Sequence, residues 1–276
     1  MTETQTSSDQ ATGVRGVVWR RPVAAFVVLA FALSWGFWTL FLLTSSQVMF
    51  FLGGLGPAMA AGIVAWQIGT LQPWLGRVLR WRVSPWFYVF AFGFPVLLYG
   101  LPNVILAVFG AQPDLSLLGE RLPAYAATWV AAFFMGGLEE PGWRGFALPR
   151  LEQRYTPVRA TVLLGVVWGL WHLPVAPLAI VVTVPLAFFY TWLFNRTGSA
   201  LLCVLLHASV TPAQDHLTLI ADSPTVDLAI YGTLVAAAVG FVAATRGRLG
   251  LADGGVGKDP SAPAGPPVAD SKGSGS

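Results

Sequence analysis

Long apolar runs separated by short polar segments make up most of this chain. A transmembrane helix needs about 20 mostly apolar residues, and eight stretches fit this requirement, although charged residues interrupt the inner ends of the fourth and fifth. They lie at 22–44, 48–72, 85–111, 122–140, 159–173, 175–195, 198–216 and 226–245. Apolar and polar residues do not alternate with a period of two, so helices rather than strands are expected. The pattern predicts an all-α, polytopic membrane protein, a bundle of eight transmembrane helices.

The two ends of the chain differ from this pattern. Residues 1–14 are polar and too poor in apolar groups to form a core, and residues 249–276 are dense in Gly, Pro and Ser. Such composition is typical of disordered segments. We therefore expect a disordered N-terminus at 1–14, an eight-span domain at 15–248 and a disordered tail at 249–276.

Composition supports insertion in a bilayer. Hydrophobic residues make up 55% of the 276 positions and charged residues only 11%, whereas soluble domains carry about 25% charged residues. The net charge of +3 does not indicate a nucleic-acid partner, because the arginines gather at the ends of the predicted spans. All Lys and Arg except Arg121 and Arg144 fall near one side, which predicts cytoplasmic N- and C-termini. The preference for Arg over Lys, with abundant Gly, Ala and Val, suggests a bacterial plasma membrane.

Five ionisable residues lie inside the apolar runs, where charge is costly: Glu139, Glu140, Arg144, His172 and His207. A charged side chain at the centre of a bilayer costs about 2.5–3.5 kcal/mol on insertion scales. Such residues usually mark a functional site, and we take these five as the candidate site.

The first group is the segment Glu139-Glu140-Pro141-Gly142-Trp143-Arg144. On a helix Glu140 and Arg144 are four residues apart, with the acid first, the better orientation for an ion pair. Glu139 is turned by about 100° and can point elsewhere, so one carboxylate can be neutralised while the other transfers protons. Pro141 should bend or interrupt the helix here. The alternative is an ion pair at an exposed helix end.

The second group is Trp168-Gly169-Leu170-Trp171-His172. Trp168 and His172 are four residues apart, so the indole ring can hold the imidazole. With a turn at 154–157, Glu139 and His172 are equidistant from the turn of a helical hairpin and should lie at similar depth. We therefore expect these two side chains to meet, unless a bend at Pro149 or Pro141 shifts the register.

The third group contains His207 and Thr211, again four residues apart. An imidazole N–H and a threonine hydroxyl could together donate hydrogen bonds to a developing oxyanion. The alternative is that Thr211 bonds back to its own helix.

Glu139, His172 and His207 could equally bind a divalent metal such as zinc, because a carboxylate and two imidazoles are a known zinc set. The helical zinc motif with two histidines four residues apart is absent. With or without metal the chemistry is the same: water activated by Glu139 attacks an amide.

These groups together resemble the CPBP family of intramembrane proteases, which includes the CAAX prenyl endopeptidases and is also called the Abi family. The resemblance covers roughly residues 50–220. It rests on Glu139-Glu140-x-x-x-Arg144, on Trp168-x-x-x-His172 and on His207, with Gly56-Pro57-Ala58 and Thr197-Gly198-Ser199 beside them.

The resemblance implies a helical bundle with a cavity open to cytosol and membrane. Glu139 and His172 would activate the water, with Glu140 and Arg144 beside them, and His207 and Thr211 would stabilise the oxyanion. Two positions depart from the family pattern: Trp168 replaces a Phe, and Thr211 replaces an Asn or Asp. Losing one oxyanion donor costs about 100–1,000-fold in other hydrolases.

We therefore interpret the chain as an intramembrane endopeptidase acting on a membrane-associated or lipidated peptide, with zinc or another divalent metal, or with none. One alternative is a non-catalytic scaffold or bacteriocin-immunity-type protein that retains the fold, which Thr211 favours. A proton-coupled transporter is the other, because carboxylates and histidines at membrane depth also form proton relays.

Overall fold

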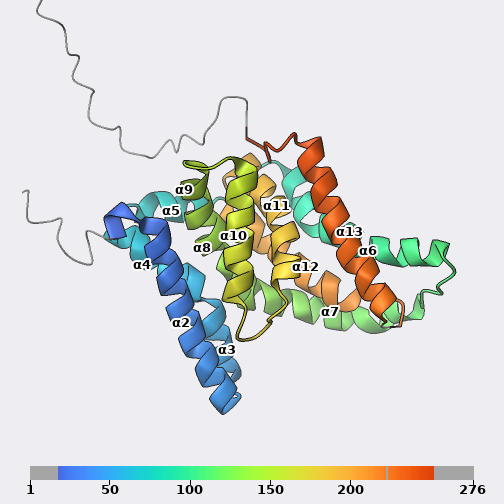
Figure 1. Cartoon of the computed structure of the whole chain (residues 1–276). Helices are drawn as coiled ribbons and strands as arrows, with labels where there is room; N and C mark the ends of the chain where they lie inside the picture. The colour runs from blue at the N-terminus through green and yellow to red at the C-terminus, as the bar shows by residue number, and fades with distance from the viewer. Residues whose placement is uncertain (1–17, 222, 252–276) are drawn as a thin grey trace, which may run out of the picture.

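The computed structural model describes residues 18–221 and 223–251 (Figure 1). In these ranges the chain forms helices and no strand, which confirms the predicted all-α class. The predicted disordered N-terminus at 1–14 lies outside the described residues. Of the predicted tail, only 249–251 is described, and Leu249 is fully buried there.

Each of the eight apolar stretches overlaps a helix or a pair of helices. Their bounds are α2 (Pro22–Thr44), α3 (Gln47–Gly54) with α4 (Gly56–Gln67), α6 (Pro85–Val108), α7 (Ser116–Met135), α10 (Pro157–Trp171), α11 (Ile180–Thr197), α12 (Ala200–His216) and α13 (Pro224–Ala244). A short helix, α5 (Leu71–Val78), follows α4.

The count of eight spans is not confirmed. Among the described residues, α2, α6 and α13 are long and apolar enough to cross a bilayer, and α3 with α4 would be a fourth span bent by 44°. Helix α10 has 15 residues and α12 has 17, which at 1.5 Å per residue is shorter than a hydrocarbon core of about 30 Å. Helices α7 and α11 are longer but less apolar.

Three helices that are not long apolar spans, α10, α11 and α12, occupy the middle of the molecule. In Figure 1, α10, α11 and α12 lie between α2 and α4 on one side and α6 and α13 on the other. Helix α11 is buried over most of its length. Its side chains face protein rather than lipid, so they need not be as apolar as those of a lipid-facing span.

Helices α10 and α11 approach closely at two glycines of α10. A Cβ added to Gly169 would lie 2.6 Å from the Cα of Ile180, and one added to Gly165 would lie 3.0 Å from the Cα of Val184. The Thr183 hydroxyl donates a 3.1 Å hydrogen bond to the Gly165 carbonyl across this contact. Small residues four apart allow membrane helices to pack backbone to backbone.

We expect Gly169→Ala to separate α10 from α11 and to lower the free energy of unfolding by about 1–3 kcal/mol, the usual range for overpacking. Thermal unfolding in detergent micelles measures this. The matched control is Gly240→Ala on exposed α13, where a Cβ meets no atom within 4 Å. Equal unfolding temperatures for the two variants would contradict the close packing.

A buried acid ties the segment before α10 to the end of the described chain. Glu152 ends α9 (Leu148–Glu152) and is only 5% exposed. The Asn195 side chain donates to Glu152 Oε1 at 2.8 Å and to the Leu249 carbonyl at 3.0 Å. Burial raises the pKa of Glu152 from its ordinary 4.5 to about 7, although the hydrogen bond from Asn195 opposes the shift.

This pKa shift predicts a pH-dependent stability. Below pH 4.5 the carboxyl is protonated in both states. As the pH rises towards 7 the unfolded chain ionises first, so stability falls by roughly 3 kcal/mol over this window and is constant above it. We expect Glu152→Gln to remove this slope and to be more stable than the wild type at pH 8. Chemical unfolding at pH 5 and pH 8 measures it, and parallel slopes in both proteins would contradict it.

Candidate active site

The sequence-predicted acids lie on an irregular segment between α7 and α9. It consists of a 3₁₀ turn η2 (Gly137–Glu139), one helical turn α8 (Glu140–Gly142) and a π-helical turn η3 (Trp143–Ala147). Residues 139–148 are all buried. Irregular backbone at membrane depth is tolerated where protein surrounds it, and π-helical turns are frequent at functional sites.

Glycines allow neighbouring helices to contact this segment directly. A Cβ at Gly142 would lie 2.5 Å from the carbonyl oxygen of Pro57 in α4, and a Cβ at Gly136 would lie 2.7 Å from His207 Nε2 in α12. Only residues without a Cβ permit such approaches. The two glycines therefore set how closely the segment and His207 come together.

Three long side chains bond the carbonyl groups of the irregular segment. Trp74 Nε1 donates to the Pro141 carbonyl at 2.8 Å, Arg77 Nη1 to Gly145 at 3.4 Å, and Arg150 Nη1 to Phe146 at 2.8 Å. Backbone carbonyls left without a regular helical partner need such donors when buried. These bonds hold the segment in its irregular conformation.

Glu140 and Arg144 form an ion pair that is fully buried on both sides. Arg144 Nη1 lies 3.0 Å from each carboxylate oxygen of Glu140. Glu140 Oε1 also lies 3.1 Å from His207 Nδ1. Because an ionised carboxylate only accepts hydrogen bonds, this contact places a proton on Nδ1. The structure thus contains the pair that the four-residue spacing predicted, with His207 as a third member.

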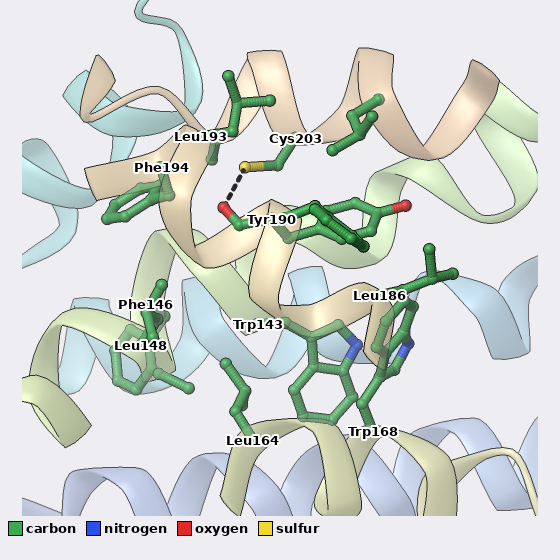
Figure 2. Close-up of a cluster of buried hydrophobic side chains, with 14 of the residues drawn as sticks. Trp143, Phe146, Leu148, Leu164, Trp168, Leu186, Tyr190, Leu193, Phe194 and Cys203 are labelled. Carbon is green, nitrogen blue, oxygen red and sulfur yellow. Dashed lines mark hydrogen bonds between the residues drawn. The ribbon is translucent and has the colours of Figure 1, made fainter. Parts of the chain in front are cut away.

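Two aromatic rings enclose the guanidinium of Arg144. Its Cζ lies 4.4 Å from the centre of the Trp168 ring and 4.5 Å from that of the Tyr190 ring. Figure 2 shows both residues within a cluster of buried apolar side chains, with the Cys203 thiol bonded to the Tyr190 carbonyl. Among the described residues, Arg144 Nε and Nη2 and the Tyr190 hydroxyl have no hydrogen-bond partner. For the Arg144 guanidinium, cation–π attraction offsets part of the cost of burying N–H groups without hydrogen bonds.

Glu139 is 4% exposed and points to α10. Its Oε2 accepts a hydrogen bond of 2.8 Å from Trp168 Nε1. Trp168 therefore contacts both charged centres: its ring stacks on Arg144 and its N–H binds Glu139. The other oxygen, Oε1, is left for a further partner, since no hydrogen bond to it occurs among the described residues.

His172 and Glu139 each form a hydrogen bond with Trp168 and not with each other. His172 caps α10, and its Nδ1 lies 2.9 Å from the Trp168 carbonyl. Its ring packs edge-on against Trp171 at 4.7 Å. No direct Glu139–His172 hydrogen bond occurs in the part of the chain that the structure describes. The irregular turns after Glu139 shift the register of the hairpin, as the reservation about Pro141 anticipated.

Thr211 bonds back to its own helix, the alternative to a role as oxyanion donor. Its hydroxyl donates to the His207 carbonyl at 3.4 Å, one helical turn back. Its role as an oxyanion donor, like the catalytic roles of the other five residues, stays a prediction.

The three residues considered as metal ligands are not gathered into one cluster in this structure. Among the described residues, no three His, Cys, Asp or Glu side chains form a group able to hold a metal ion. Their hydrogen bonds use Glu139 Oε2 and the Nδ1 atoms of His172 and His207. Such bonds are also usual for metal-bound carboxylates and imidazoles, so a metal role for these residues stays a prediction. We derive the chemistry from the protein groups alone.

Sequence reasoning missed two members of the site. Trp168 was assigned only to hold His172, whereas its indole N–H binds Glu139. Tyr190 was not considered, although a tyrosine in the middle of the apolar run 180–194 was a usable signal. Buried tyrosines usually find a polar or cationic neighbour.

Together the fold and the site define an integral membrane protein of helices around a buried acid–base cluster. The family model "Type II CAAX prenyl endopeptidase Rce1-like" matches residues 121–211, which contain all six predicted site residues. The chain is also 27% identical over 177 residues to CAAX prenyl protease 2 of Methanococcus maripaludis, a match that spans 52% of this chain and 64% of that relative. Both matches support the resemblance to the CPBP family that the motifs indicated.

We expect Arg144→Ala to lower the free energy of unfolding by about 3–5 kcal/mol, because it leaves Glu140 buried without its cation. The double variant Glu140→Gln/Arg144→Met should recover much of this loss. Thermal unfolding in micelles of the single and double variants measures the coupling, with Arg82→Ala, an exposed arginine, as the control. A single variant as stable as the control would show that the pair contributes nothing.

Proposed function

We propose that this protein is an intramembrane endopeptidase in which Glu139 activates a water molecule for attack on a peptide bond. The observation that carries the proposal is the division between the two adjacent acids. Arg144 compensates the charge of Glu140 at 3.0 Å, whereas Glu139 accepts one hydrogen bond from Trp168 and keeps an oxygen for water. Two carboxylates in different environments commonly take different roles in hydrolases.

Trp168 positions the base. Its N–H holds Glu139 Oε2, and the centre of its ring lies 5.7 Å from that of His207. A general base must lie within hydrogen-bond reach of the proton that it takes. A water held by Oε1 would satisfy this condition.

The reaction then needs only groups of this chain. Glu139 accepts a proton from the water, and the resulting hydroxide attacks the amide carbon to give a tetrahedral oxyanion. The C–N bond breaks as the protonated Glu139 returns its proton to the leaving nitrogen. The products are a carboxylic acid and an amine, which become a carboxylate and an ammonium group by proton transfer, and Glu139 is regenerated as a carboxylate.

His207 is the group best placed to stabilise the oxyanion. With Nδ1 protonated towards Glu140, a second proton on Nε2 would make His207 a cation that can donate to the oxyanion. The charges of Glu139, Glu140, Arg144 and His207 would then sum to zero, which favours the arrangement in a buried site. His172 lies at the end of α10 and would orient the water or the substrate from the other side of Trp168.

The substrate that suits this site is a peptide carried at the membrane, by a lipid or by its own apolar segment. A buried site within a helical membrane protein favours chains delivered from the bilayer. The relative from Methanococcus maripaludis is a CAAX prenyl protease, which supports a prenylated or similarly lipidated peptide as the substrate class. We place the protein in a bacterial plasma membrane with both termini cytoplasmic.

We expect Glu139→Gln to abolish hydrolysis while leaving the fold intact, because Gln can still accept the hydrogen bond from Trp168 but cannot take a proton. The test is mass spectrometry of new peptide termini in membranes that carry the wild type or the variant at matched levels. The matched control is Glu152→Gln, which replaces a buried acid of α9 outside the site. Termini made by the wild type and the control, and not by Glu139→Gln, would support the proposal.

The alternative is a non-catalytic scaffold or immunity protein, which the Thr211 hydroxyl bond to its own helix favours. It predicts the same termini with all three proteins and a phenotype that survives Glu139→Gln. That result would overturn the peptidase proposal.

A further inference from the structure

A cavity of about 870 Å³ lies away from the candidate active site, at the end of the molecule where α2 begins. Figure 1 shows the start of α2 together with α5 and α9 at this end. Three parts of the chain line the cavity. They are residues 19–24 before and at the start of α2, the turn 68–70 between α4 and α5 with residues of α5, and residues within 149–155. Its volume is in the range of small-ligand sites.

The cavity is strongly basic. Five arginines from three separate parts of the chain line it, and none of the described residues that line it is acidic. They are Arg20, Arg21, Arg77, Arg150 and Arg154. Like charges gathered from distant segments repel one another, so the arrangement indicates an anionic occupant. Arginines bind phosphate oxygens in a fixed, often bidentate geometry.

The position of the cavity indicates a lipid as the source of the anion. It opens beside Pro22, the first residue of a helix long and apolar enough to cross a bilayer. Trp19 lines it and is 61% exposed, as expected for a tryptophan at the membrane–water boundary. Along α2, Ala24 lines the cavity and Val28, four residues on and on the same face, is 70% exposed. Acyl chains could follow this face into the hydrocarbon.

The cavity is connected to the candidate active site through two of its arginines. Arg77 and Arg150 also donate to the carbonyls of Gly145 and Phe146 in the π-helical turn that carries Arg144. Arg150 further donates to Thr70 at 3.1 Å. An anion in the cavity would therefore contact side chains that hold the turn in place.

We propose that this cavity binds the phosphate headgroup of an anionic phospholipid at the membrane edge, and that the bound lipid stabilises the turn bearing Arg144. The arginines supply the charge, Trp19 the boundary contact and the α2 face the path for an acyl chain. This site is independent of the proposed hydrolysis, because binding and stability report on it without any measurement of activity.

The test uses the full chain in micelles and in nanodiscs. We expect native mass spectrometry to show retained phosphatidylglycerol in preference to phosphatidylcholine, and nanodiscs containing phosphatidylglycerol to raise the unfolding temperature. The triple variant Arg20→Gln/Arg21→Gln/Arg154→Gln should lose the preference by about tenfold or more, given the contribution of each basic residue near an anionic surface. These three arginines are exposed, so their replacement leaves the core intact.

The matched control changes three other exposed arginines outside the cavity, Arg82, Arg159 and Arg246, to Gln. It should keep the wild-type preference, since the net charge changes equally in both variants. Equal losses would show diffuse surface attraction and overturn the site. An unchanged preference in the cavity variant would overturn it as well.

A further experiment distinguishes a lipid phosphate group from a soluble phosphate as the bound anion. Inorganic phosphate is added to the protein in phosphatidylcholine nanodiscs, and the unfolding temperature is measured. No stabilisation supports the lipid. Stabilisation by inorganic phosphate equal to that by phosphatidylglycerol, lost in the cavity variant, would assign the cavity to a soluble phosphate and overturn the lipid proposal.

Discussion

The buried ion pair between Glu140 and Arg144 is the interaction on which the rest of the site depends. Both side chains are fully buried, and burying two charges is unfavourable unless each finds close partners. Nη1 of Arg144 serves Glu140, while the rings of Trp168 and Tyr190 cover the rest of the guanidinium. His207 Nδ1 is a further hydrogen-bond partner of the Glu140 carboxylate. Each partner comes from a different helix, α10, α11 or α12, so forming this pair requires the central helices to be assembled correctly.

The same requirement explains the irregular backbone. A regular helix would also pair Glu140 with Arg144 and turn Glu139 away, but here the segment must in addition contact α4 at Gly142 and bring Glu139 to Trp168. The 3₁₀ and π-helical turns rotate the side chains relative to one another, and Trp74, Arg77 and Arg150 bond carbonyls of this segment. Side chains of α5 and α9 thus satisfy carbonyls that a regular helix would bond internally.

Much of this could be predicted from the sequence, because lipid imposes strong constraints. The apolar runs marked the helices, and the charges inside them marked Glu139, Glu140, Arg144, His172 and His207, which lie around Trp168 and its neighbours. The span count could not be predicted in this way, since α10 to α12 are shielded by other helices and their sequences obey packing rather than hydropathy. The predicted hydrogen bond between Glu139 and His172 does not occur among the described residues, because two irregular turns change the register by an amount that spacing does not encode. Tyr190 was missed because one polar atom hardly alters an apolar run.

Charge balance connects these observations. Glu139 and Glu140 are adjacent, and with Arg144 alone the cluster carries one net negative charge; a protonated His207 removes it. The site can therefore hold one mobile proton, on His207 or on Glu139, without leaving a large uncompensated charge in a medium of low dielectric constant. The Glu140–Arg144 pair contributes a fixed electrostatic field, and the Trp168 N–H orients Glu139 within that field. A cluster built only to stabilise helix packing would have no need for the second acid, since Glu140 and Arg144 already satisfy one another. Glu139 is thus the acid whose presence the proposed proton transfer would explain.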